Sequence, residues 1–217
     1  MQGYQQPYTQ PNALDYWVGQ RGLTDYVTDA GTAILLSIIT CGIYGLFIVY
    51  KLVQRRDDHF KRMAAVVDTS IQQLRLKATG REHEIQEELG QLEGLKNQML
   101  MMASERGAVI WLLICIFTGI GMWIVYYLLM QDYVQHDSVE AQYFTVMSSA
   151  LAKLGLSGQA AQAVRTVPDC EFITFLLLSI VTCGIYGFYW MYVMINDFNV
   201  HFTAQTAWED FIATALR

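Results

Sequence analysis

Three long runs without a charged side chain divide this chain. Asp, Glu, Lys, Arg and His are absent from Ala30–Tyr50, Gly107–Gln131 and Phe172–Asn196. Each run is close to the ~20 apolar residues with which a helix crosses the hydrocarbon core of a bilayer. Helices buried in a soluble core usually keep a polar stripe, and none is visible in these runs. The pattern therefore predicts an all-α integral membrane protein with membrane segments at 30–53, 107–131 and 172–196.

The same runs contain an internal repeat. Thr-Cys-Gly-Ile-Tyr-Gly occurs twice, and the aligned stretches Leu35–Tyr50 and Leu177–Tyr192 share eleven of sixteen residues. A degenerate third copy lies in the middle run. Internal repetition indicates the unit from which a fold is built. The residues that form this structural motif are Thr40, Gly42, Tyr44, Gly45, Gly119, Gly121, Thr182, Gly184, Tyr186 and Gly187.

The glycines interrupt each membrane segment near its middle, where they weaken a helix. Two geometries fit: one kinked span, or a re-entrant hairpin of two short arms that turn at the glycines. Length favours the span. We therefore predict spans of alternating direction, with 30–53 and 172–196 parallel and 107–131 opposite. In the hairpin alternative all three repeats run the same way.

The polar linkers have helical periodicity. In 54–106 apolar residues recur every three or four positions around a turn signal at Thr79-Gly80, which predicts an antiparallel coiled-coil hairpin. We also predict a short helical hairpin in 132–171, with its second helix at 159–165, and an amphipathic C-terminal helix at 197–217. Residues 1–29 are expected to form a flexible tail followed by a segment at the membrane interface.

Composition and charge agree with a membrane protein. Hydrophobic residues make up 53% and charged residues 16% of the chain, against about 25% charged in soluble domains. Nine of the fourteen Lys and Arg residues lie in 54–106 and two in 132–171, which indicates that the first linker is cytoplasmic. The first linker also holds nine acidic residues, so we expect no nucleic-acid surface.

Catalytic motifs are absent from the sequence. There is no Gly-x-Gly-x-x-Gly, phosphate loop, Gly-x-Ser-x-Gly or His-Glu-x-x-His. We therefore predict no enzyme and no cofactor. Cys41 and Cys183 occupy equivalent repeat positions; apolar packing of the thiols is favoured, and a disulfide between them stays an open alternative.

Three of the four histidines, His59, His136 and His201, also occupy equivalent places. Three converging imidazoles would make a metal or proton site, but common ancestry of the repeats explains the pattern without one. No carboxylate accompanies all three. Alternating spans would moreover place His59 and His201 on the cytoplasmic side and His136 outside. We predict no shared histidine site and no metal site.

The stretches Leu35–Lys51 and Leu177–Tyr192 resemble a bacterial integral-membrane domain family of unknown function with a Thr-x-Gly-Ile-Tyr signature followed by Gly and Trp or Tyr. The middle copy departs from the signature because it lacks the tyrosine. The resemblance implies a protein of the plasma (inner) membrane of a bacterium. It carries no established activity and transfers no catalytic residue.

From these features we expect a non-enzymatic, self-associating membrane scaffold or assembly subunit. Its partners would be the lipid bilayer, further copies of the chain in a homo-oligomer that packs through small residues, and a protein bound by the 54–106 hairpin. The alternative is a small-solute or ion permeation unit built on the glycine-broken helices.

Overall fold

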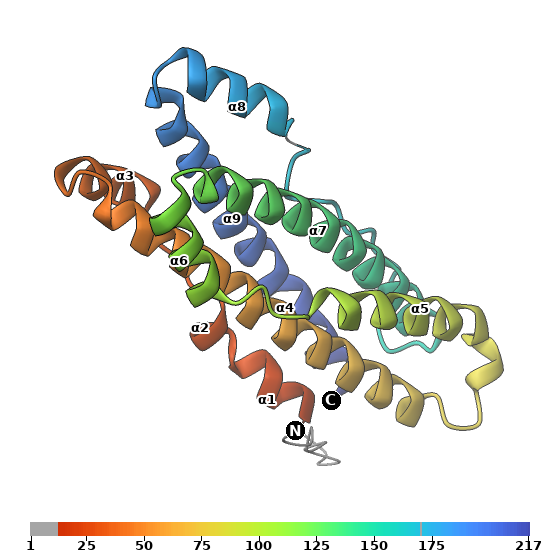
Figure 1. Cartoon of the computed structure of the whole chain (residues 1–217). Coiled ribbons are helices and arrows are strands. Elements are labelled where there is room, and N and C mark those ends of the chain that lie inside the picture. Colours follow the sequence, from red (N-terminus) through yellow and green to blue (C-terminus); the bar gives the residue numbers. More distant parts are fainter. Residues whose placement is uncertain (1–12, 170) are drawn as a thin grey trace.

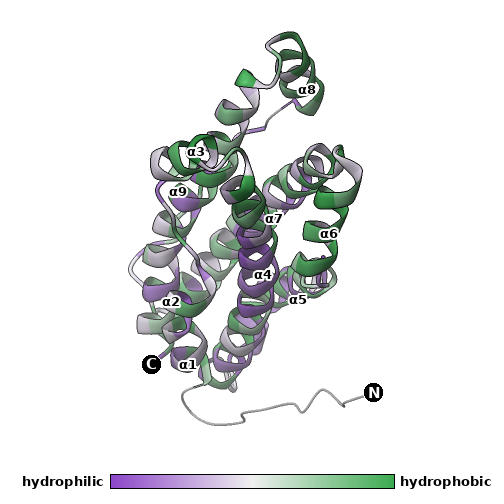
Figure 2. Cartoon of the chain, turned by 60° about the vertical axis from the view of Figure 1, so that its left-hand side comes forward, coloured by the Kyte–Doolittle hydropathy of each residue, from purple (hydrophilic) through white to green (hydrophobic). Residues whose placement is uncertain are grey.

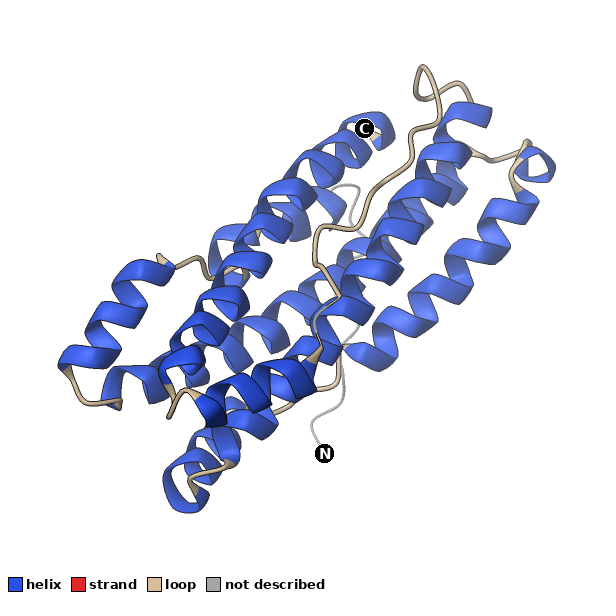
Figure 3. Ribbon diagram, turned by 90° about the horizontal axis from the view of Figure 1, so that it is seen from above, coloured by secondary structure: helices blue, strands red, loops and turns tan. Residues whose placement is uncertain are grey.

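The computed structural model describes residues 13–169 and 171–217, and every regular element in them is helical. The predicted all-α class is confirmed. The elements are α1 (Ala13–Gly19), α2 (Arg21–Thr24), α3 (Ala30–Ile39), α4 (Ile43–Lys77), the 3-10 turn η1 (Glu82–Glu84), α5 (Gln86–Met102), α6 (Ala108–Thr118), α7 (Gly121–Lys153), α8 (Phe172–Val181) and α9 (Ile185–Leu216). The long helices α4, α7 and α9 form the body of the molecule, and α5 packs along them (Figures 1 and 3).

Each charge-free run folds as a helical hairpin. A short helix turns back onto the start of a long one in the pairs α3–α4, α6–α7 and α8–α9, and all three turns lie toward one end of the molecule (Figure 1). The predicted kinked spans are therefore wrong, and the chain turns back at the glycines as in the hairpin alternative. Within 13–169 and 171–217, no helix combines the length and the apolar character that a membrane crossing requires.

The repeated Thr-Cys-Gly sequence ends one helix and starts the next. Cys41, with φ 49°, and Gly42, with φ 92°, both adopt the left-handed conformation. The backbone N–H of Gly42 donates to the carbonyl of Ser37 at 2.8 Å, which is the 6→1 bond of a Schellman helix end. The Thr40 hydroxyl then accepts from the Tyr44 N–H at 2.9 Å, in the first turn of α4. The same bonds recur in the second copy, at 179–186.

The α6–α7 hairpin closes differently. Gly119 is left-handed, with φ 67°, and Gly121 packs directly against the preceding helix. A Cβ atom on Gly121 would lie 2.8 Å from the backbone N and Cα of Cys115. Gly121 occupies the repeat position of Tyr44. The middle copy therefore lacks the tyrosine because its two helices leave no space there for a side chain.

The three repeats run in the same direction, since α4, α7 and α9 all start at the hairpin turns (Figure 1). The predicted alternation is wrong. It followed from the single-span geometry, and the excess of basic residues in the first linker agreed with it. Three of these arginines, however, are buried in contacts within the chain. Arg55 donates to the Met194 carbonyl at 2.6 Å, and Arg56 and Arg62 pair with carboxylates on α7 and α9. Such residues report internal packing rather than membrane sidedness.

The linker 54–106 is not separate from the repeats. Helix α4 continues through residue 53 without interruption, and the predicted turn at Thr79-Gly80 is confirmed by the helix end at Lys77 and a φ of 81° at Gly80. The apolar stripes of α4 and α5 are buried together with those of α7 and α9 in one core. These stripes include Met63, Val67, Ile71, Leu74, Leu92, Leu95 and Met99.

Two further predictions need correction. Residues 159–165 are not helical; the extended segment 158–167, here called the strap, instead lies along α7. Its N–H groups are satisfied by α7 side chains, as in the bonds from Ala161 N to Ser148 Oγ (2.8 Å) and from Thr166 N to Asp137 Oδ2 (2.8 Å).

Residues 13–24 also depart from the prediction of an interfacial segment. They form α1 and α2, and α1 buries Leu14 and Val18 in the core that the long helices share. The hydrophobic side of α1 therefore faces protein. The tail predicted for residues 1–12 lies outside the described residues.

Candidate functional site

The hairpin end of the molecule exposes large apolar side chains on all three repeats. Figure 2 colours most of this upper part green, because its residues are hydrophobic. Phe117 is 81% and Val181 78% exposed. Others on the same hairpins are Leu35, Ile38, Ile39, Ile43, Phe47, Val109, Ile110, Leu113, Ile116, Ile120, Ile173, Leu177, Ile180 and Ile185. This end combines exposed hydrophobic surface with a complete lack of charge.

At the centre of the bundle the three repeat histidines meet. His59 comes from α4, His136 from α7 and His201 from α9, and each is at most 2% exposed. The His59 and His136 Nε2 atoms are 3.2 Å apart, and the three ring centroids lie 5.0 to 5.7 Å from one another. The predicted separation of His136 from His59 and His201 is therefore wrong. It failed with the alternating topology on which it depended.

Glu140 joins this group, and sequence reasoning missed it. It lies one helical turn after His136, so both side chains are on one face of α7. Its Oε2 is 2.9 Å from His201 Nε2 and 3.9 Å from His136 Nε2. The donor atoms of the four side chains all lie within 4.8 Å of one another. The available signal was the His-x-x-x-Glu spacing, which only the middle repeat carries.

Two aspartates orient the histidines from outside. Asp25, in the segment between α2 and α3, has its Oδ1 2.8 Å from His59 Nδ1, and its Oδ2 accepts from Arg62 at 2.9 Å. Asp137 has its Oδ1 2.9 Å from His201 Nδ1. The strap holds Asp137 in turn, because the backbone N–H groups of Thr166 and Val167 donate to its Oδ2.

The buried position shifts the protonation of the cluster. Burial lowers the pKa of His59 and lowers that of His136 well below its usual value. Burial alone would also lower the pKa of His201, but the negative charges of Glu140 and Asp137 outweigh it and raise the pKa to about 9. Near neutral pH the cluster therefore has two neutral imidazoles and one imidazolium paired with carboxylates.

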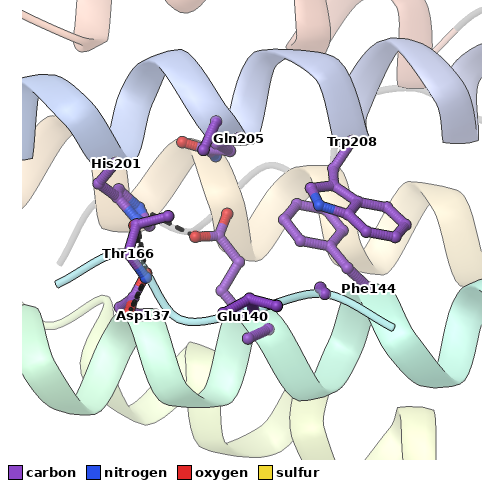
Figure 4. Close-up of a pocket in the computed structure, with 11 residues that line it drawn as sticks. Asp137, Glu140, Phe144, Thr166, His201, Gln205 and Trp208 are labelled. Carbon is purple, nitrogen blue, oxygen red and sulfur yellow. Dashed lines mark hydrogen bonds and ion pairs between the residues drawn. The ribbon is translucent and has the colours of Figure 1, made fainter. Parts of the chain in front are cut away.

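A small cavity adjoins the cluster on the α7–α9 side (Figure 4). Its volume is about 20 Å³, which is room for roughly one water molecule. Asp137, Glu140 and His201 line it from the helices, and Thr166 lines it from the strap. The cavity is too small for an organic substrate.

Aromatic side chains fill the bundle between the histidines and the hairpins. Phe198 stacks on Tyr133, with ring centroids 3.7 Å apart, and on His201 at 4.8 Å. Further toward the hairpins, Leu52 and Trp190 are fully buried. The axis of the bundle is therefore packed with side chains.

The remaining motif residues serve the hairpins. Thr40, Gly42, Thr182 and Gly184 make the turns, and Tyr44 and Tyr186 begin the long helices. A Cβ on Gly45 would meet the Met191 methyl group at 3.5 Å, whereas Gly187 faces open space.

The described cysteines differ in their exposure to solvent. Cys115 is buried, in agreement with the expectation of packed thiols. Cys41 and Cys183 are free and exposed at the turns, so for these two residues that expectation is wrong, and the disulfide alternative is not realised.

Residues 171–209 match a family model described as Domain of unknown function (DUF4234). The DUF4234 match spans α8 and the part of α9 that carries His201, so it covers one repeat, with its hairpin and its histidine. It agrees with the expectation of a relation to a family of unknown function and brings no activity with it. No curated protein and no solved structure matches the chain.

Proposed function

We propose that this chain is a non-enzymatic membrane-anchored scaffold, which the three apolar hairpins seat in one leaflet of a bilayer. The observation that carries the proposal is the exposed, charge-free surface shared by all three hairpins at one end of the molecule. Contiguous apolar surface of this kind is typical of a membrane or protein interaction site. The resemblance of the Thr-Cys-Gly-Ile-Tyr-Gly copies to a bacterial membrane family favours the plasma membrane of a bacterium.

The hairpin dimensions support insertion to half the depth of a bilayer. The short helices have 10, 11 and 10 residues, and at 1.5 Å per residue each is about 15 Å long, half of the ~30 Å hydrocarbon core. Backbone polar groups are costly in that environment unless they are bonded. The turns meet this requirement, since the Gly42 and Gly184 N–H groups donate to carbonyls of the preceding helices.

Two observations bear on the permeation alternative and on self-association. The packed axis around Leu52, Trp190 and Phe198 disfavours the alternative of a permeation path through the single chain. The apolar stripes of 54–106 are buried within the chain and offer no surface for self-association, so homo-oligomer formation is not part of this proposal. Exposed Leu76 on α4 and Leu100 and Met101 on α5 are the large apolar side chains of this linker that remain for a protein partner.

An environment-sensitive probe at a hairpin turn tests the proposal. With the other cysteines replaced by serine, Cys183 is labelled with a nitrobenzoxadiazole dye and mixed with phospholipid vesicles. The control carries the dye at Thr79→Cys, which is exposed at the α4–α5 turn, far from the hairpins (Figure 1).

We expect a blue shift and a gain in fluorescence at position 183 and none at position 79. Quenching by lipids brominated along the acyl chain should then occur at 183 only. A dye at 183 that stays as accessible to aqueous iodide as the dye at 79 would refute the anchoring role.

A further inference from the structure

We propose that His59, His136, His201 and Glu140 bind one divalent transition-metal ion of the zinc class, which ties the three repeats together at the centre of the bundle. Each repeat contributes one imidazole, and the middle repeat adds the carboxylate. The proposal goes beyond membrane anchoring and does not depend on it.

The spacing of the donor atoms fits such an ion. Zinc binds imidazole nitrogen and carboxylate oxygen at about 2.0–2.1 Å in a tetrahedral arrangement, which places neighbouring donors about 3.3 Å apart. Here His59 Nε2 and His136 Nε2 are 3.2 Å apart, and Glu140 Oε2 lies 2.9 Å from His201 Nε2 and 3.9 Å from His136 Nε2. All four donor atoms lie within 4.8 Å of one another, so the most widely spaced donors would have to approach by up to about 1.5 Å on metal binding.

The cluster leaves buried polar atoms without a hydrogen bond. His201 Nε2 and Glu140 Oε1 have no hydrogen-bond partner among the described residues, although both side chains are nearly fully buried. His201 Nε2 forms an ion pair with Glu140 Oε2 at 2.9 Å, without the alignment of a hydrogen bond. Buried polar groups are rarely left in this state. A metal ion bound by both side chains would satisfy these atoms.

The outer contacts prepare the imidazoles for a metal. Histidine ligands usually donate their second ring N–H to a carboxylate, which fixes the tautomer and leaves the other nitrogen free for the ion. His59 Nδ1 meets Asp25 and His201 Nδ1 meets Asp137, so both Nε2 atoms are left facing the centre. His136 is held by its stack on Phe60, with ring centroids 4.0 Å apart.

Glu140 supplies the negative charge that a cation would meet. The neighbouring carboxylates have arginine partners: Arg62 pairs with Asp25 and Glu209, and Arg165 lies 3.8 Å from Asp137. Among the described residues, Glu140 makes ion pairs with His136 and His201 alone. Its charge is therefore available to a metal ion that replaces the proton on His201.

The donor set selects the kind of metal. Three imidazoles and one carboxylate suit zinc, cobalt or another first-row ion, whereas calcium and magnesium prefer oxygen ligands alone. Four protein ligands close the tetrahedron, which is characteristic of structural rather than catalytic zinc sites. At the equivalent of Glu140 the other repeats have Met63 and Gln205, which contact each other and complete the layer beneath the histidines.

Cobalt titration of the full chain in detergent tests the site, after removal of bound metal with a chelator. Tetrahedral Co²⁺ has visible absorption bands far stronger than those of the hydrated ion, so the spectrum reports both geometry and stoichiometry. Zinc is then added as the competitor. Helical circular dichroism of every variant confirms that it is folded. Because the measurement is made in detergent, it is independent of the vesicle assay.

The variants are His136→Asn and Glu140→Gln, and His83→Asn is the matched control. His83 lies in η1, outside the cluster. We expect one Co²⁺ per chain, displaced by Zn²⁺, with affinity lowered at least about 100-fold in both cluster variants and unchanged in the control. Should His136→Asn not fold, the nearly isosteric Glu140→Gln decides. Absence of saturable binding at one equivalent, or equal affinity in Glu140→Gln and wild type, would overturn the assignment.

Discussion

Replacing Gly121 by alanine is a direct test of the hairpin geometry. In the folded chain the new Cβ would lie 2.8 Å from the Cys115 backbone N and Cα and 2.9 Å from the Ile114 carbonyl carbon. These neighbours are backbone atoms of α6 and cannot rotate away. In a kinked span, where the two halves of the segment diverge from the glycine, the same Cβ would meet no such backbone.

The expected cost follows from the size of the overlap. An ordinary contact requires about 0.6 Å more separation between the helices, and overpacking of this kind costs about 1–3 kcal/mol. Backbone contacts place Gly121→Ala toward the upper end of this range. The lower entropy of unfolded alanine returns about 0.4–1 kcal/mol. We therefore expect a net loss of about 2 kcal/mol, equivalent to a melting temperature lower by about 4–8 °C in a chain of this length.

Two glycines of the third repeat, Gly184 and Gly187, serve as controls. A Cβ on Gly187 meets nothing within 4 Å in a helix of ordinary φ, so Gly187→Ala should stabilise the chain by up to about 1 kcal/mol. Gly184 also faces open space but has a φ of 90°, so Gly184→Ala should cost about 1–2 kcal/mol through backbone strain alone. The assay is thermal unfolding in detergent followed by circular dichroism. If Gly121→Ala melts with the wild type, α6 does not fold back on α7.

Three further changes probe the buried polar and aromatic groups. Arg62→Met removes the arginine that two buried carboxylates, Asp25 and Glu209, share, and should cost about 3–5 kcal/mol in denaturant unfolding. Arg75→Met, at an exposed pair, should cost at most about 1 kcal/mol. Asp137→Asn should lower cobalt affinity about 10–100-fold, measured by calorimetric titration, without unfolding the chain; an unchanged affinity would show that this carboxylate does not position His201. Trp190→Ala should cost about 3–5 kcal/mol in melting experiments, and half-exposed Tyr192→Ala should cost far less; equal losses would contradict the packed axis.

The sequence alone determined the repeat unit and the places where its helices break. Charge-free runs, the Thr-Cys-Gly breaks and the periodic stripes of 54–106 are local features, and each is decided by residues within a few positions of one another. The sequence therefore located the breaks at Gly42, Gly119 and Gly184 and placed His59, His136 and His201 at equivalent positions of the repeat. It also indicated the turn at Thr79-Gly80.

Only the tertiary structure decided whether the chain folds back at these breaks and whether equivalent residues of the repeats meet. A glycine pair indicates that a helix is interrupted, but whether the chain continues or folds back depends on left-handed φ values at Cys41 and Cys183 and on contacts such as Gly121 against Cys115. The common direction of α4, α7 and α9 then follows, because each of these helices starts at a hairpin turn. Helices of equal direction bring equivalent residues to one level, whereas alternating spans would have separated them. Asp25, Glu140 and the three histidines come from distant parts of the chain, and no local pattern encodes their meeting, because it is produced by the packing of α4, α7 and α9.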